Sequence, residues 1–152
     1  ITARLSEEFQ HAETYVGIQK MRHGNRLTVT FPSEQDIASL GNPSVPRVIL
    51  QPILENAFKH ALERHDGNNE LSVRIYREEG RIHIVVESDG PFLPPETVAS
   101  MQDSLNTAPG EKGKGLYNVH PRLVIMHGTG LRLYGRPQGG LRVEIILQQE
   151  EK

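Results

Sequence analysis

The sequence predicts an α/β fold, a two-layer sandwich in which helices pack on one face of a mixed β-sheet. Several segments repeat apolar residues at the spacing of an amphipathic helix, and others alternate apolar and polar residues as half-buried strands do. Short polar turns join neighbouring strands, which places these strands side by side in one sheet. With 152 residues, 36% of them hydrophobic and 24% charged, the chain is long enough to bury a single core.

A helix and a strand open the chain. Residues 5–22 are expected to form an amphipathic helix ended by Gly24, because apolar residues recur at helical spacing: Leu5, Phe9, Ala12 and Val16. Residues 26–31 alternate as a strand. Pro43 and Pro46 then mark a loop, since proline interrupts regular backbone hydrogen bonding.

The next helix is predicted from residue 50 to about Arg64, with Pro52 near its first turns. Its apolar residues would face the core: Leu50, Ile53, Leu54, Ala57, Phe58 and Ala61. The polar side carries an amide, an amine and an imidazole three and four residues apart: Asn56, Lys59 and His60. Such a side is either an ordinary solvated surface or a site for a metal and phosphates.

A hairpin follows a polar turn at residues 66–69. Residues 71–75 and 82–86 alternate as strands, and residues 78–80 form the turn between them. Residues 91–113 contain a short polar helix and a glycine-rich end with little to bury, a composition typical of a mobile lid.

The last predicted elements are a helix and two strands. The helix covers residues 115–127, and the strands at 131–133 and 141–147 flank a turn at 137–140. Residues 148–152 are expected to form a solvated tail.

Glycines and lysines come directly before the helix that starts near residue 115. Gly113 and Gly115 permit positive φ and close backbone approach, and the start of the helix offers unpaired N–H groups to an anion. Lys112 and Lys114 add positive charge. A single pair of glycines is more often a flexible turn. It indicates a phosphate site only in combination with the polar side of the earlier helix.

The two segments together resemble a known family. Residues 50–60, LQPILENAFKH, look like the N box of LytS/YehU-type sensor histidine kinases, and residues 113–123, GKGLYNVHPRL, look like their second glycine box. Residues 5–27 are similar to the segment that leaves the dimerisation helices in that family. The resemblance covers nearly the whole chain. It implies an ATP-binding domain of the GHKL class with the Bergerat fold, and ATP and Mg²⁺ as cofactors.

The resemblance also implies roles for single residues. Asn56 would be the magnesium ligand, and Glu55 would polarise the incoming nucleophile, although a helical neighbour points roughly 100° away and could be structural. The residues expected to bind phosphates are Lys59, His60, Gly113, Lys114, Gly115 and Leu116. The expected catalytic group is Glu55, Asn56 and Lys59. Two further residues match the family pattern without an assigned role: Asn118 and Arg122.

Residues 86–92, VESDGPF, occupy the place of the family's first glycine box, DNGxG, but depart from it. Ser88 stands where the family has the Asp that accepts a hydrogen bond from the adenine amino group, Asp89 stands for Asn, and Phe92 for the second glycine. An uncharged acceptor makes a weaker bond than a carboxylate. The closing Gly-Thr of the family is altered at residues 139–141. The residues expected to meet the nucleotide here are Ser88, Asp89 and Gly90.

Residues 1–24 are interpreted as the end of a dimerisation-region helix and residues 25–152 as the ATP-binding catalytic domain. The abrupt start indicates a fragment of a protein-histidine kinase whose upstream dimerisation and phosphoacceptor domain receives the γ-phosphate of ATP and passes it to a response regulator. The full-length protein is expected to be a homodimer and a membrane-anchored bacterial sensor, with this domain cytoplasmic and the membrane reached only through upstream segments. The net charge of −2 argues against nucleic acid as a partner, and the absence of cysteine fits a reducing compartment.

Two alternatives to the catalytic domain of a sensor kinase stay open. One is a degenerate relative that binds nucleotide weakly or not at all and acts as a signalling interaction module. The other is another GHKL ATPase of the gyrase or chaperone kind. The opening helix favours the sensor kinase and the degenerate relative. A histidine-based metal site is disfavoured because no HxxxH pair exists. His11 is not expected to be the phosphoacceptor, since the family's acceptor lies in an upstream motif.

Overall fold

The structure is a computed structural model that describes residues 2–62, 69–106 and 115–148, with the side chains of residues 60–62 excepted. A five-stranded sheet has the strand order β2-β4-β5-β7-β6. The strands of this sheet are β2 Leu27–Thr30, β4 Asn69–Glu78, β5 Arg81–Ser88, β6 Arg132–Gly135 and β7 Leu141–Gln148. Only β2 and β4 pair in parallel, and the other pairs are antiparallel, so the sheet is mixed as predicted.

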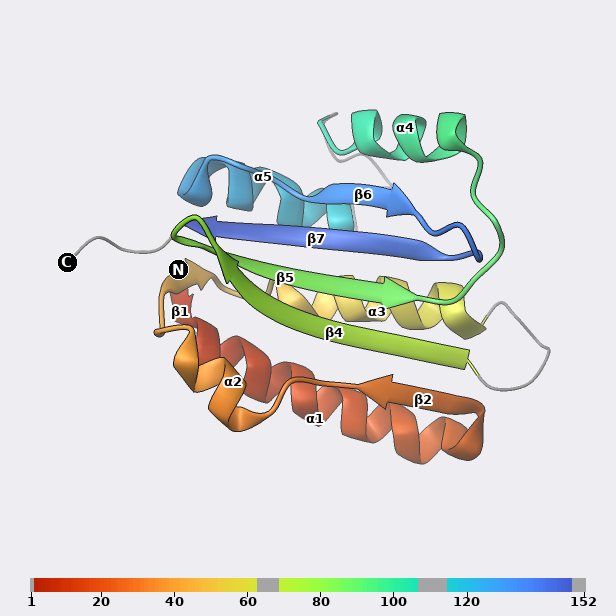
Figure 1. Cartoon of the computed structure of the whole chain (residues 1–152), viewed down its shortest axis with the longest axis horizontal. Helices are drawn as coiled ribbons and strands as arrows, with labels where there is room; N and C mark the ends of the chain where they lie inside the picture. Colours follow the sequence, from red (N-terminus) through yellow and green to blue (C-terminus); the bar gives the residue numbers. More distant parts are fainter. Residues whose placement is uncertain (1, 63–68, 107–114, 149–152) are drawn as a thin grey trace.

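Three helices form a second layer behind the sheet (Figure 1): α1 Leu5–His23, α3 Leu50–Leu62 and α5 Leu116–His127. The strands bury every second residue towards this layer, as Ile82, Ile84 and Val86 of β5 do. These side chains join one core with the apolar sides of α1, α3 and α5. The predicted α/β sandwich with helices on one face is therefore confirmed. The long, apolar helix that a membrane crossing requires does not occur in the described part of the chain.

The first helix belongs to this core. Leu5, Phe9, Ala12 and Val16 are buried, so the predicted spacing identified the face that packs. The helix ends at Gly24, whose φ of 56° suits glycine and whose N–H donates to the carbonyl of Lys20.

The loop predicted around Pro43 and Pro46 is partly wrong. Residues Ser44–Pro46 form strand β3, which pairs antiparallel with strand β1, Thr2–Arg4, in a separate two-stranded sheet. This pairing joins residues about forty positions apart, and local composition carries no signal for such a contact.

Helix α2, Glu34–Ser39, was not predicted, although its start has a recognisable cap. The Ser33 hydroxyl accepts a hydrogen bond from the N–H of Asp36 at 3.1 Å, an ordinary N-cap arrangement.

The predicted hairpin is present. β4 and β5 are joined by Glu79 and Gly80, whose φ values of 52° and 74° are those of a two-residue type I′ turn. The left-handed conformation that this turn requires is easily adopted by Gly80 but not by most other residues.

The predicted lid segment contains helix α4, Pro95–Ser104, which lies beyond β6 at the edge of the sheet (Figure 1). The expectation of little burial holds for most of this helix, where Val98 is the one buried residue, and Leu105 directly after it is also buried. The side-chain amide of Gln102 also bonds the edge of β6, donating to the carbonyl of Leu131 at 2.8 Å and accepting from the N–H of Leu133 at 2.7 Å. Residues 107–113 of the predicted lid lie outside the described residues.

Candidate nucleotide site

Asn56 lies on α3 among residues that hold this helix against the sheet. Ile53, Leu54, Ala57 and Phe58 are buried, and Asn56 itself is half-buried. Its Nδ2 atom is buried, and no hydrogen-bond partner for it is found among the described residues. Native proteins satisfy nearly all buried polar atoms, so this amide nitrogen is available to donate to a ligand or to an ordered water.

The neighbours of Asn56 on α3 lie on a more exposed surface. Glu55 is exposed, and its Oε1 accepts a hydrogen bond from Nε2 of Gln51 at 3.0 Å, one helical turn earlier. On the α1 side, burial first and then the charge of Glu55 raise the pKa of Tyr15. Glu55 therefore faces Gln51 and α1. Lys59 is exposed, and the side chain of His60 lies outside the described residues.

The second predicted segment forms the start of α5. Gly115 is the N-cap residue with φ 77°, a conformation that favours glycine, and its carbonyl accepts from the N–H of Asn118 at 3.0 Å. The first N–H groups of a helix have no partner within the helix and can bind an anion. Leu116 is buried and anchors this turn. Gly113 and Lys114 lie outside the described residues.

Ser88 is the last residue of β5 and is buried at 2% exposure. Because side chains alternate along a strand, Ser88 shares the face of Ile84 and Val86, which is the face covered by the helix layer. Its hydroxyl thus lies on the same side of the sheet as α3.

Asp89 has both carboxylate oxygens bound to the protein. Oδ2 accepts from the N–H of Glu70 at 2.6 Å, and Oδ1 accepts from Nη1 of Arg136 at 3.1 Å. These bonds join the end of β5 to the start of β4 and to the turn between β6 and β7. Of the two adjacent candidates for adenine recognition, Asp89 has both carboxylate oxygens bound to the protein, whereas the Ser88 side chain makes no hydrogen bond to the described residues.

The backbone of the first glycine box is held by the glycines of the β6–β7 turn. A Cβ atom on Gly140 would lie 1.9 Å from the Ser88 carbonyl oxygen, and one on Gly139 would lie 2.5 Å from that of Gly90. The N–H of Gly140 donates to the carbonyl of Pro91 at 3.0 Å. Close backbone approach therefore requires glycine at both turn positions.

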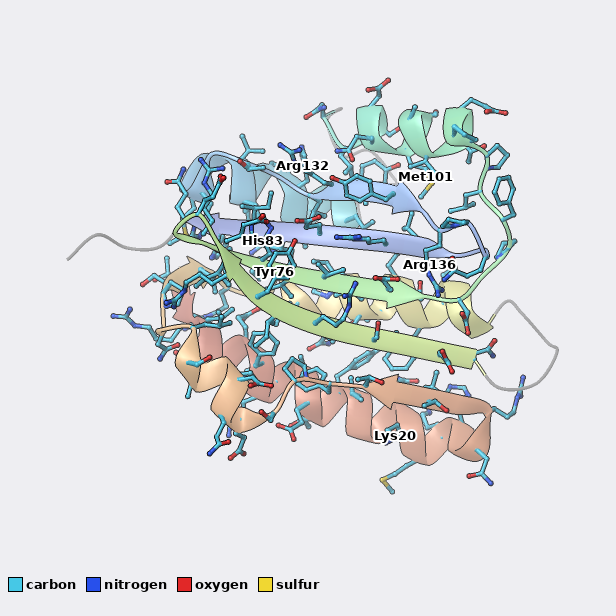
Figure 2. All side chains as sticks on the ribbon, viewed as in Figure 1. Lys20, Tyr76, His83, Met101, Arg132 and Arg136 are labelled. Carbon is cyan, nitrogen blue, oxygen red and sulfur yellow. The ribbon has the colours of Figure 1, made fainter. Side chains whose placement is uncertain are left out.

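Arg136 is a residue that the sequence analysis missed. Its guanidinium is mostly buried and lies between Asp89 and Glu87, with Nε 3.3 Å from Oε2 of Glu87. Figure 2 shows Arg136 beside the end of β5 and the start of β7. An arginine in a surface turn has no distinguishing local pattern, so only the fold reveals this role.

His120 anchors α5 next to the site. Its Nδ1 accepts from the N–H of Leu131 at 2.9 Å, so Nε2 carries the proton and lies 3.0 Å from Oδ1 of Asn106. Burial lowers the pKa of His120, which favours this neutral form. A Cβ atom on Gly130 would overlap the ring at 2.2 Å, so glycine is needed there.

The surface has a cavity apart from these residues. It measures about 480 Å³, lies between α4 and β6, and is lined mainly by apolar side chains and by none of the predicted site residues. Within the described ranges, no group of three or more His, Cys, Asp or Glu side chains could hold a metal ion.

Comparison with known proteins identifies the family. Residues 41–151 match the family model described as histidine kinase-, DNA gyrase B-, and HSP90-like ATPase. The chain therefore belongs to this family of ATPases.

Relatives of this chain include sensor kinases. The sensor histidine kinase YpdA of Escherichia coli (strain K12) is 27% identical over 85% of this chain and 22% of its own length. The sensor protein LytS of Enterococcus faecalis (strain ATCC 700802 / V583) is 28% identical over 99% of this chain and 26% of its own length. The chain thus spans about a quarter of these relatives. It is an ATP-binding domain of the sensor histidine kinase type, which confirms the predicted resemblance.

Solved structures show the same fold. The catalytic domain of the histidine kinase ThkA superposes with a TM-score of 0.67 at 18% identity, covering 98% of this chain and 99% of that chain. The histidine kinase domain of the Escherichia coli osmosensor EnvZ gives a TM-score of 0.59 at 21% identity, over 99% and 89%.

Proposed function

We propose that this domain binds Mg-ATP and presents its γ-phosphate to a histidine on a dimerisation domain of the same protein, from which the phosphate passes to a response regulator. The observation that carries the proposal is the buried amide nitrogen of Asn56, which has no hydrogen-bond partner among the described residues, in a chain of this ATPase family. The whole protein is then a homodimeric, membrane-anchored sensor, with this domain on the cytoplasmic side.

The residues fit a nucleotide with one magnesium ion. Mg²⁺ usually keeps several waters and takes one or two protein oxygens plus the phosphates, so the amide oxygen of Asn56 is a sufficient protein ligand. When bound, the ion supplies positive charge that neutralises the phosphates. Asn56 has hydrogen-bonding capacity at its amide nitrogen for a ligand as well.

The remaining site residues position the nucleotide. We infer that the N–H groups after Gly115, with Gly113, Lys114 and Leu116, bind phosphate oxygens, together with Lys59 and His60. The Ser88 hydroxyl accepts a hydrogen bond from the adenine amino group beside Gly90, while Asp89 holds the loop in place through Arg136. Phosphoryl transfer needs positioning and charge neutralisation more than covalent chemistry from the protein.

Glu55 has a weaker case as a catalytic residue. Its contact with Gln51 and its influence on Tyr15 support an orientation towards α1, away from Asn56. In the proposed site it acts on the phosphoacceptor side, where its carboxylate near α1 orients the incoming histidine.

The second candidate function is a signalling interaction module with weak or no nucleotide binding, and the serine at position 88 supports it. A neutral hydroxyl replaces the usual carboxylate, and Asp89 is bound to Glu70 and Arg136. Calorimetric titration of the chain with ATP and GTP, with and without Mg²⁺, separates the two. The kinase proposal predicts saturable ATP binding whose affinity increases with Mg²⁺, and a lower affinity for GTP. No heat of binding at millimolar ATP would leave the interaction module as the function.

A further inference from the structure

The backbone that leads into α3 is held from two sides by residues of the other two core helices. Glu8 of α1 accepts hydrogen bonds from the N–H groups of Val48, Ile49 and Leu50 at 3.0, 2.7 and 3.4 Å. Arg122 of α5 donates to the carbonyls of Arg47 and Val48, the latter at 2.9 Å. Helices α1, α3 and α5 therefore meet at residues 47–50.

Glu8 supplies the N-terminal cap of α3 from a distant part of the chain. The first N–H groups of a helix lack partners within it, and a carboxylate there also complements the helix dipole. Glu8 is 5% exposed, an unusual position for a carboxylate unless several donors bind it. Its cost of burial is offset by the three backbone N–H groups.

Val48 adds strain at the same point. Its φ is 59°, in the left-handed region that a β-branched residue rarely adopts. Its N–H is bound by Glu8 and its carbonyl by Arg122, so these two side chains fix the peptide on both sides of the unusual torsion. Strained residues persist only where surrounding contacts determine them, and they concentrate at functional sites.

The same residues connect to both halves of the nucleotide site. Asn56 follows Leu50 on α3 by about 9 Å of helix, and Arg122 follows Gly115 by about 10 Å of α5, at 1.5 Å per residue. A shift of α1 that moves Glu8 would move the start of α3, and Arg122 ties that start to α5. Such a shift would then change the separation between Asn56 and the N–H groups after Gly115.

We infer that Glu8 and Arg122 are positioning residues for the nucleotide site, which act through the strained turn at Val48 and make phosphate binding sensitive to the position of α1. The effect on phosphate binding rests on the proposed function, whereas the structural link between α1, α3 and α5 does not require a nucleotide. A link of this kind would let the segment before α1 regulate the site.

The test replaces Glu8 by glutamine, which keeps its size and removes its charge. Glu8→Gln should reduce the gain in ATP affinity on adding Mg²⁺ by about tenfold, a typical coupling between sites. Binding of adenosine, which has no phosphates, should stay unchanged. A purely structural role would alter both affinities together or neither. The matched control is Glu13→Gln, which removes the same charge from an exposed position of α1 and should match the parent.

A second readout works without nucleotide. In ¹⁵N-labelled protein, the backbone amide signals of Asn56 and Gly115 should shift in Glu8→Gln and stay in place in Glu13→Gln. If the parent binds no Mg-ATP, the proposed function fails, but these shifts would still establish the link between α1, α3 and α5. Unshifted signals of Asn56 and Gly115 would overturn the inference whatever the nucleotide result.

Arg122→Lys covers the case in which Glu8→Gln does not fold. Lysine keeps the charge but cannot hold two carbonyls with the fork of a guanidinium. The same loss of the Mg²⁺-dependent gain, with unchanged adenosine binding, would support the link. Equal Mg²⁺ dependence in Arg122→Lys and the parent would overturn it.

Discussion

Asp89 and Arg136 form a partly buried ion pair, with Oδ1 and Nη1 3.1 Å apart, that fastens the end of β5 to the turn between β6 and β7. The side chains are 18% and 14% exposed, and Asp89 also accepts the N–H of Glu70. Asp89 therefore has a structural role, whereas its neighbour Ser88 lies on the helix side of the sheet.

Arg136→Ala should destabilise the fold, because it leaves the carboxylate of Asp89 with one donor fewer. Hydrogen bonds to charged groups contribute about 1.5–3 kcal/mol, and we expect a loss in this range from urea unfolding. The control is Arg74→Ala, which removes the more exposed partner of Glu87 and should cost at most about 1 kcal/mol. Equal losses in the two variants would show that burial gives Arg136 no special weight.

Gly140→Ala tests the close approach to the first glycine box. A Cβ would lie 1.9 Å from the Ser88 carbonyl oxygen, at a φ of 92°, so both overlap and backbone strain apply. We expect a loss of about 2–5 kcal/mol.

Gly80→Ala is the matched control, since its φ is 74° but nothing lies within 4 Å of the added atom. Strain alone should cost about 1–2 kcal/mol there. If Gly140→Ala cost no more than Gly80→Ala in the same unfolding measurement, the glycine would not be needed for close packing.

The helices and most strands of this fold could be predicted from the sequence because their apolar periodicity coincides with burial, as at Phe9 and Ile84. Strand β3 and the cap that Glu8 provides could not, since each depends on contacts about forty residues away. Helix α2 had a local signal, Ser33 with Asp36, but it is too short for periodicity to show.

The candidate site divides in the same way. Asn56 and Gly115 lie in segments whose composition already indicates a phosphate site, and both occupy the expected elements. Arg136 contacts Asp89, which lies 47 positions earlier in the chain, and Arg122 contacts Val48, about 75 positions earlier. Neither contact therefore has a local sequence pattern. The roles assigned to all of the site residues stay predictions, those of Asn56, Glu55, Ser88 and Gly115 as well as those of Lys59, His60, Gly113 and Lys114.

Ser88→Asp should restore a charged acceptor for the adenine amino group. Charge-assisted hydrogen bonds contribute about 1.5–3 kcal/mol, which corresponds to roughly a ten- to a hundredfold gain in ATP affinity. Because Ser88 is buried, the new carboxylate should also lower the melting temperature without ATP. GTP carries a carbonyl at the matching position, so its affinity should not rise.

Asp89→Ala separates the two neighbouring residues in the same calorimetric assay. We expect it to reduce stability more than adenine selectivity, since both carboxylate oxygens bind the protein. If Asp89→Ala abolished ATP binding while Ser88→Asp had no effect, adenine recognition would belong to Asp89.

His120 should make stability fall in mild acid. Burial keeps its pKa below the ordinary value of 6.5, so the unfolded chain takes up a proton at a higher pH than the folded chain. The contribution of neutral His120 to stability is fully present above pH 6.5, and the free energy of unfolding should decrease as pH falls from about 6.5 towards 5. His120→Gln should have a shallower dependence in urea unfolding at several pH values. A slope equal to that of the parent would exclude His120 as the source.

The proposed function depends most on Asn56 as the protein ligand of the magnesium ion. Calorimetric titration of Asn56→Ala with ATP, at zero and saturating Mg²⁺, tests this directly, with exposed Asn25→Ala as the matched amide deletion. We predict that Asn56→Ala stays folded and loses the increase in ATP affinity that Mg²⁺ gives the parent, while Asn25→Ala keeps it. The same increase in Asn56→Ala as in the parent would contradict the account.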